Sequence, residues 1–548
     1  MTPKPTAGRS RGAPIEAATD GFRARRVLLA LLAAFLATRI FALVHLELHN
    51  DSALFVEMSR EIAADRDANK YLSMDGRLFG VYKDPLQLWI GAIVVGLSRD
   101  PVLPLRITSM LFGLVNVLFL YLFASRLFEN RRIGAIAAAL AVFSDYLLLF
   151  DSLFLAEVYV YGLGAVFLYL VLLAIEGAWS GRPRWIPTAL AAPLFGSILL
   201  VKQSGAAWGL FACMVLPLFL ACRRLSPKGR AGRILLAIGT ITAILVLGRL
   251  LYNQVIPAEF ASLRRSGPLA EVHTFGPAEL LRFPAARWLG NLRIYFAELL
   301  RIETGGLWIV PAAFLVARLA RRKKGTGRGA AGALLLAWIL SFLPFVLVMK
   351  HGFIRHFGIG IFFFHLAAAD SAYHLFRPGP RRRTLGLALL GALVAFRLHT
   401  SYLPLARDGQ TDLAMRETPE GWANGLGISA MLRNLEGLPR GVLLIDPQWG
   451  HPGMPVWIHE ESYPQLELVS LTPDVLSNLD ALRERARGSG RKVFFLLDAR
   501  ARGERPFVDS LLDRDSLWAR KTVIPKVYRG KRLPDSTIVI AEARPFGR

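Results

Sequence analysis

The chain has 548 residues, of which 53% are hydrophobic, and its mean hydropathy is +0.40. This composition excludes an ordinary soluble protein and indicates a protein that crosses a membrane many times. The net charge of +25 would suit a nucleic-acid partner, but the basic residues lie in short clusters between apolar segments, a pattern that reflects membrane topology instead.

The N-terminal residues 1–26 form a basic tail without a small-residue cleavage site, so we expect a cytoplasmic tail and not a removed signal peptide. The first apolar segment follows at 27–44, slightly short of the roughly 20 residues that a membrane helix needs. Ten more segments predict a polytopic α-helical domain over residues 27–404 with about eleven transmembrane helices: 102–124, 133–150, 158–176, 186–201, 205–222, 233–251, 305–320, 330–349, 357–376 and 384–403.

Basic clusters occupy every second connection between these segments, for example at 126–132, 223–230, 321–328 and 377–383. Basic loops stay in the cytoplasm, so the other loops, 46–101 and 252–304 among them, are expected on the outer face of the inner (plasma) membrane. The odd number of spans places the residues after the last segment on that outer side too.

The composition changes after the last apolar segment, and residues 405–548 predict a small α/β domain outside the cytoplasm. Three short apolar runs at 441–446, 493–498 and 537–540 are typical of buried strands. Thr472 and Pro473 predict a helix start between the first two, because threonine is a good N-cap and proline suits the first turn.

The loop after the first segment carries several ionisable residues at the mouth of a membrane span. They include Asp51, Glu57 and Arg60, and Lys83 follows before the chain enters the membrane again. Charges at such a depth are costly and suggest a functional site. They could equally be ordinary solvated loop charges, and the loop alone leaves both interpretations open.

Two further outer positions combine carboxylates with a cation. Asp151 and Glu157 flank a helix junction, and Lys202 ends the segment at 186–201. Glu157 would also be favourable simply as an acidic residue in a first helical turn, and Lys202 as a lysine that reaches the membrane surface.

The short outer loop at 350–356 is basic, against the charge bias that the other outer loops obey. Arg355 and His356 lie in it. A bound anion would explain the exception, since arginine offers paired donors to phosphate. Carboxylates facing cations suit a transfer reaction, in which a carboxylate takes a proton from the acceptor and cations stabilise a phosphate leaving group. Outside the cytoplasm, the activated donor would be a lipid-linked phosphate.

Several motifs carry a resemblance to a known family. Residues 51–62 resemble the first outer loop of the C-type (GT-C) glycosyltransferases that use polyprenyl-phosphate sugars, and in particular the protein O-mannosyltransferase-like bacterial branch with the lipid A aminoarabinose transferases. Lys83-Asp84-Pro85-Leu86 is similar to that branch's Lys-Pro-Pro-Leu element, and residues 105–113 to its entry into the second span. Ser152–Glu157 and Arg355-His356-Phe357 fall where the family has an acidic residue and an Arg-Tyr pair. The resemblance covers about residues 27–400.

The resemblance implies transfer of a sugar, with inversion, from a polyprenyl-phosphate donor to an acceptor outside the cytoplasm, which could be a lipid, a glycan or a protein. It implies Asp51 as the catalytic carboxylate and Glu157 as its acidic partner. It also implies donor-phosphate contacts from Lys83 and Arg355, with Lys202 and His356 as further candidates. The family often has Asp-Glu at 51–52 and Asp at 157, so the acceptor and a requirement for a divalent metal stay open.

Two other classes of protein compete with this hypothesis. A lipid or solute transporter or flippase could have the same number of spans, but it would usually show paired repeats and charges near the middle of the membrane. A scaffold that displays the C-terminal domain would leave the basic outer loop unexplained. The sequence favours the enzyme.

Overall fold

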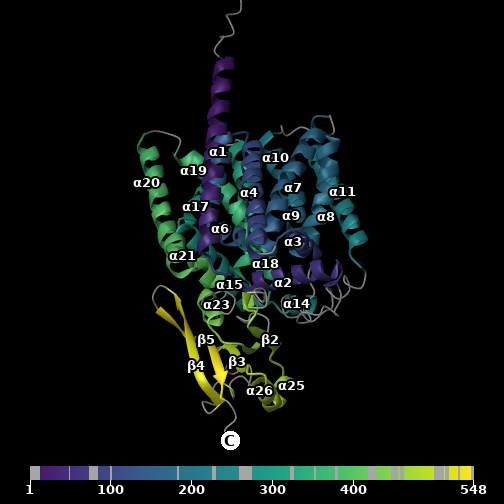
Figure 1. The fold of residues 1–548 in the computed structure, drawn as a ribbon. Coiled ribbons are helices and arrows are strands. Elements are labelled where there is room, and N and C mark those ends of the chain that lie inside the picture. The colour runs from purple at the N-terminus through teal and green to yellow at the C-terminus, as the bar shows by residue number, and fades with distance from the viewer. Residues whose placement is uncertain are drawn as a thin grey trace, which may run out of the picture.

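The computed structural model describes residues 13–48, 50–72, 84–98, 101–181, 184–224, 230–257, 275–320, 326–350, 353–376, 380–417, 427–445, 455–456, 462–498, 511, 517–528 and 531–544. These residues form a large bundle of helices with a small mixed sheet at one end (Figure 1). The first helix runs the length of the bundle and ends close to the sheet domain.

Eight helical segments in the described part of the chain are long and apolar enough to cross a membrane. The helices that build them are α1 (Ala13–His45), α4 (Val102–Leu127), α7 (Ala156–Trp179), α9 (Ala206–Met214) with α10 (Leu216–Arg224), α11 (Arg230–Val255), α18 (Thr326–Val348), α19 (Gly358–Phe376) and α20 (Pro380–Arg397). The last segment continues through η4 (Leu398–Tyr402) and α21 (Leu403–Asp408).

Two bent helix pairs would raise the number of spans to ten. The pair α5 (Arg131–Val142) and α6 (Asp145–Asp151) bends by 63°, and Ser144 caps the second helix by accepting a hydrogen bond from the Leu147 N–H at 3.1 Å. The second bend, of 108°, separates α15 (Ala285–Arg293), η2 (Ile294–Leu300) and α16 (Arg301–Thr304) from α17 (Ile309–Ala320). Gly305 and Gly306 make this turn with φ of +62° and +90°, which glycine adopts without strain.

All eleven predicted apolar segments are therefore mostly helical, and the difference in number has a physical cause. Two of them belong to the bent pairs, and 186–201 corresponds to α8 (Trp185–Val201), a shorter apolar helix of 17 residues. Hydropathy detects apolar length but not a break in the helix axis.

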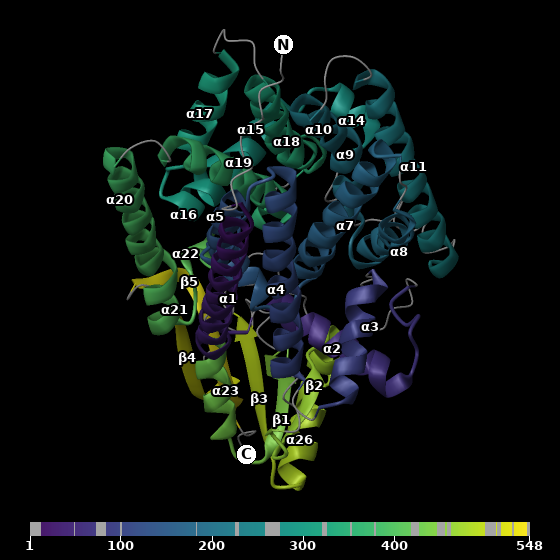
Figure 2. The same ribbon diagram turned by 90° about the horizontal axis from the view of Figure 1, so that it is seen from above.

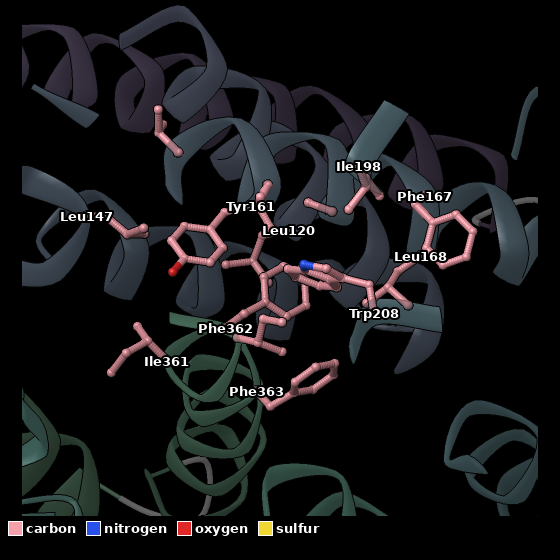
Figure 3. Close-up of a cluster of buried hydrophobic side chains, with 14 of the residues drawn as sticks. Leu120, Leu147, Tyr161, Phe167, Leu168, Ile198, Trp208, Ile361, Phe362 and Phe363 are labelled. Atoms are coloured by element: carbon pink, nitrogen blue, oxygen red, sulfur yellow. The ribbon is translucent and has the colours of Figure 1, made fainter. Parts of the chain in front are cut away.

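The helices at the two edges of the bundle expose most of their apolar surface. The helices α11 and α20 lie on opposite sides of the bundle (Figure 2). Only about a fifth of the residues in the most apolar stretch of each are buried. In α7 the share is 72%. The centre contains an aromatic cluster with Trp208, Phe362 and Phe363 (Figure 3). The exposed edges thus suit contact with lipid chains, and α7 is a core helix.

Short helices gather at the end of the bundle that carries the sheet domain (Figure 1). They are α2 (Asn50–Asp65), α3 (Pro85–Gly96), α14 (Pro277–Leu281) and the one-turn helix η3 (Ile354–Phe357). Another one-turn helix, η1 (Gln203–Gly205), follows α8. The described candidates for the site belong to these segments and to the helix ends beside them.

The C-terminal sheet has five strands in the order β2-β1-β3-β5-β4. The strand β1 (Gly441–Ile445) pairs in parallel with β2 (Leu466–Ser470) and β3 (Lys492–Asp498), and β5 (Lys531–Ala543) pairs antiparallel with β3 and β4 (Trp518–Tyr528). Side chains of α23 (Ile428–Glu436) pack on one face, and those of α25 (Pro473–Ser477) and α26 (Leu479–Gly488) on the other. The predicted α/β class is confirmed, including the N-cap at Thr472, which accepts a hydrogen bond from the Val475 N–H at 3.3 Å.

Residues just after the predicted boundary at 405 pack with the helical bundle. Leu405 in α21, and Leu413 and Ala414 in α22 (Asp412–Glu417), belong to the core of the helical bundle. The first described element on the sheet is α23. Its N-terminus meets the end of α1, where the Glu47 side chain hydrogen-bonds backbone groups of Gly427–Ser429 and the Ser429 side chain.

Candidate active site

Asp51 lies in the first turn of α2 and is 1% exposed. Its Oδ2 atom is 2.5 Å from Nη1 of Arg355, which comes from the other half of the chain. The carboxylate is stabilised by this cation and by the positive end of its own helix. The predicted acidic loop and the predicted basic loop therefore meet.

Arg355 lies in the one-turn helix η3, and its side chain is 15% exposed. The guanidinium carbon is 5.1 Å from the centre of the Phe353 ring, a favourable cation–π contact. The neighbouring His356 accepts a hydrogen bond from the Phe353 N–H at Nδ1, at 3.4 Å. The histidine thus secures the turn that presents the arginine.

Glu157 and Lys202 form a second ion pair beside the first. The Lys202 Nζ atom lies 2.6 Å from Oε1 of Glu157, which is 4% exposed in the first turn of α7. The positive charge of Arg355 also stabilises the Glu157 carboxylate. Two carboxylates and two cations therefore lie together, and the cations keep 15% and 28% of their side-chain surface exposed.

The turn that leads into α7 is held by polar side chains from three other helices. The Phe154 N–H donates to the Ser52 hydroxyl at 2.9 Å, and Arg106 Nε donates to the Ser152 carbonyl at 2.7 Å. Gln87 donates to the Phe154 carbonyl at 3.3 Å. Ser52 follows Asp51 directly, so this network fixes both carboxylates relative to each other.

The remaining predicted residues have other surroundings. Glu57 and Arg60 pair with each other at 3.1 Å within α2. Asp151 is buried and pairs with Arg39 of α1 at 2.9 Å, in the core of the bundle and not with Asp51. Lys83 lies outside the described residues.

The basic outer loop is only partly a candidate for anion binding. The Lys350 Nζ atom lies 2.8 Å from Oε1 of Glu279 in α14. The hydrogen bond from Lys350 lowers the pKa of the Glu279 carboxyl. Among the described residues of this loop, Arg355 is the cation that pairs with Asp51.

Sequence patterns did not single out four buried ionic residues deeper in the bundle. Arg397 contacts Asp145 and lies 3.1 Å from Glu303, and His365 lies 3.5 Å from the same Glu303 carboxylate. Each is at most 5% exposed. The signal was present, because arginine and histidine inside apolar segments are rare.

No three His, Cys, Asp or Glu side chains lie together as metal ligands in the described ranges.

The chain is similar to known membrane glycosyltransferases. The family model of dolichyl-phosphate-mannose-protein mannosyltransferases matches residues 83–252, which include Glu157 and Lys202. Comparison with curated proteins finds no match. The solved structure of ArnT from Cupriavidus metallidurans in the apo state is similar with a TM-score of 0.52 and 13% identity, over 96% of this chain and 98% of ArnT.

A second similar structure is the oligosaccharyltransferase AglB from Archaeoglobus fulgidus, in complex with an inhibitory peptide and a dolichol-phosphate. Its TM-score is 0.50 at 13% identity, over 95% of this chain and 76% of AglB. This chain has the GT-C fold. The GT-C fold predicted from the sequence is thus confirmed, and with it a multi-pass membrane protein.

Proposed function

We propose that the chain is a membrane glycosyltransferase that moves a sugar from a polyprenyl-phosphate donor to an acceptor outside the cytoplasm. One observation carries the proposal: the ion pairs Asp51–Arg355 and Glu157–Lys202 lie together at one end of an apolar bundle with the GT-C fold. Carboxylates and cations at one place provide a base and a phosphate site at the same time.

In the proposed reaction, an acceptor hydroxyl or amine attacks the anomeric carbon of the donor. The new bond forms on the face opposite the phosphate, so the configuration inverts. The bond between the anomeric carbon and the phosphate oxygen breaks, and polyprenyl phosphate leaves with the electron pair. Asp51 takes the proton of the acceptor, and Glu157 holds Lys202 in place.

The cations would stabilise the negative charge that develops on the leaving phosphate. Arg355 donates to Asp51 through Nη1, and its guanidinium is a planar group of N–H donors, which suits the recognition of phosphate. Lys202 has three donors and shares one with Glu157. We include Lys83 and His356 as further contacts on the sequence resemblance. The dolichol-phosphate in the AglB complex supports a lipid phosphate as the donor group.

The position of the four charges favours an enzyme over a transporter. They lie at helix starts and ends, whereas a transporter usually places its binding residues near the middle of the membrane. A lipid-linked donor could reach them sideways from the bilayer, because α11, which packs beside α8, is apolar and mostly exposed.

Binding of polyprenyl phosphate to the purified protein in lipid nanodiscs tests the proposal. Loss of one charge-assisted contact should cost about 1.5–3 kcal/mol, so Arg355→Ala and Lys202→Ala should each bind roughly tenfold to a hundredfold more weakly. Arg126→Ala is the matched control, because Arg126 pairs with Glu176 near the other end of α4. Parental affinity in both Arg355→Ala and Lys202→Ala would overturn the phosphate site.

A further inference from the structure

The backbone carbonyl of Arg355 accepts hydrogen bonds from two tyrosine hydroxyls. Tyr146 of α6 donates at 2.8 Å and Tyr161 of α7 at 2.9 Å, and the two hydroxyls also contact each other. Both tyrosines are at most 5% exposed. Two bonds fill both lone pairs of a carbonyl oxygen.

The segment that carries Arg355 has little helical structure of its own to fix it. The helix η3 comprises only four residues, and a single 3₁₀ turn has poorer hydrogen-bond geometry than an α-helix. A small rotation of this turn would move the guanidinium away from Asp51. The two tyrosine hydroxyls therefore restrain the position from which the Arg355 side chain starts.

Tyr146 is itself held from the deeper part of the bundle. Its N–H donates to Oε2 of Glu303 at 3.1 Å. Glu303 is anchored by Arg397 and by His365. This buried ionic cluster is thus connected to Arg355 through one residue, Tyr146.

Tyr161 connects Arg355 to the other ion pair. It follows Glu157 by four residues on α7, so the two side chains share one face of that helix. Its ring lies in the aromatic cluster of the bundle, and its hydroxyl points away from Trp208 (Figure 3). One rigid helix thus presents Glu157 and also holds the carbonyl of Arg355.

Gly358 makes room for this arrangement. A methyl group at this position would overlap the hydroxyls of both Tyr146 and Tyr161. Gly358 begins α19 directly after η3, so its missing side chain lets both rings approach the turn. One carbonyl oxygen is therefore surrounded by residues of three separate elements, α6, α7 and α19.

From this convergence we infer that Tyr146 and Tyr161 are positioning residues that orient Arg355 toward the phosphate of the donor. The inference rests on the proposed function, in which Arg355 contacts that phosphate. Neither tyrosine needs to touch the donor. Each acts on it through the arginine.

The test is a double-mutant cycle on the affinity for polyprenyl phosphate in nanodiscs. In the parental background, Tyr146→Phe/Tyr161→Phe should weaken binding about tenfold to a hundredfold, and either single change about fivefold. In an Arg355→Ala background, the same two changes should alter the affinity less than about twofold, because the group that they position is gone. The single variants keep the test available if the double variant folds poorly.

Tyr463→Phe is the matched control. Its buried hydroxyl donates to the Leu432 carbonyl at 3.5 Å in the core of the sheet domain, so the change removes a similar tyrosine–carbonyl contact away from the turn that carries Arg355. It should leave donor affinity at the parental level. Gly358→Ala should reproduce the loss caused by the two phenylalanine changes.

The possible outcomes separate the two proposals. Equal weakening with and without Arg355, or no weakening by the tyrosine changes, would overturn the positioning role and leave the phosphate site intact. Parental affinity in Arg355→Ala alone would overturn the phosphate contact and the positioning role together.

Discussion

Asp51 and Arg355 are 304 residues apart in the chain, and their side chains meet at 2.5 Å. The contact joins the start of α2 to the turn before α19 at the end of the bundle that carries the sheet domain. Neither group would be stable alone at this burial, because an unpaired buried charge is costly. The pair therefore locates the proposed site, and the ion pair of Glu157 with Lys202 lies beside it.

The Glu157–Lys202 pair should be required for donor binding as a unit. Glu157→Gln removes the charge that holds Lys202 and should weaken polyprenyl phosphate binding about tenfold. Lys202→Met removes an ammonium group that donates hydrogen bonds to the phosphate, and it should weaken polyprenyl phosphate binding at least as much. The double variant should bind about as weakly as Lys202→Met, since Glu157 acts through the lysine. Purely additive losses in calorimetric binding measurements would contradict this coupling.

The buried pair of Asp151 with Arg39 should matter for stability and not for transfer. Arg39 also donates to the carbonyl of Val142 at 2.6 Å, so it joins α1 to the end of α5 as well as to α6. Removing one partner of a buried pair typically costs about 3–5 kcal/mol. Asp151→Ala should therefore lower the melting temperature clearly, with parental donor affinity in the folded fraction. A variant that melts like the parent but fails to bind donor would instead move Asp151 into the site.

Glu47 gives the contact between α1 and the sheet domain a pH dependence. Burial raises the pKa of this carboxyl from 4.5 to about 7, opposed by hydrogen bonds from residues 427–429. Between these values the folded chain holds a proton that the unfolded chain releases. The contribution to stability is therefore greatest below pH 4.5 and falls by up to about 3 kcal/mol as the pH rises to 7.

Glu47→Gln should remove this dependence, because glutamine resembles the protonated acid. The measurement compares the melting temperatures of parent and variant from pH 4.5 to 7.5. Glu467→Gln is the control, since Glu467 is 57% exposed on β2. Identical pH slopes in parent and Glu47→Gln would refute the assignment.

The sequence was informative where a pattern has one physical cause. Apolar length predicted the bundle, because a chain must cover ~30 Å of hydrocarbon with apolar side chains. The strands β1 and β3 were predicted because both are almost wholly apolar. The strands β2 and β4 escaped notice, since the first is largely half-exposed and the second is an edge strand with basic residues and Pro525.

The site could be predicted only in part for a different reason. Charges at helix ends indicated Asp51, Glu157, Lys202 and Arg355 as candidates, but no sequence pattern says which distant charges meet. Asp151 and Glu157 are six residues apart and have quite different partners. Tyr146 and Tyr161 look like ordinary aromatic core residues, and only the structure shows their hydroxyls on the carbonyl of Arg355. The chemical roles of all these residues stay predictions.

The alternation of basic loops predicts that the sheet domain lies outside the cytoplasm. A reporter that is active only in the periplasm should be active when fused after Arg548. A reporter fused after Arg224, in a basic loop, should be inactive and serves as the control. The opposite result would place the proposed site on the cytoplasmic side. A site in the cytoplasm would not need a lipid-linked donor.

The most direct measurement is sugar transfer by the purified protein and its Asp51→Asn variant. A panel of labelled polyprenyl-phosphate hexoses and pentoses is supplied in nanodiscs, with membranes of the source cells as acceptor. Release of polyprenyl phosphate should occur with at least one donor. Asp51→Asn keeps the size of the side chain but removes the charge that pairs with Arg355, so its melting temperature and donor affinity are measured as well, and turnover is compared at saturating donor. Its turnover should fall about 10²–10⁴-fold, as expected for a lost general base.

Asp65→Asn is the control, because Asp65 is 47% exposed at the end of the same helix and pairs with Lys70. It should turn over at the parental rate. A well-folded Asp51→Asn protein with near-parental turnover would contradict the role of Asp51 and leave Glu157 or Glu57 as the base. No turnover of any donor by the parent protein would contradict the central claim itself.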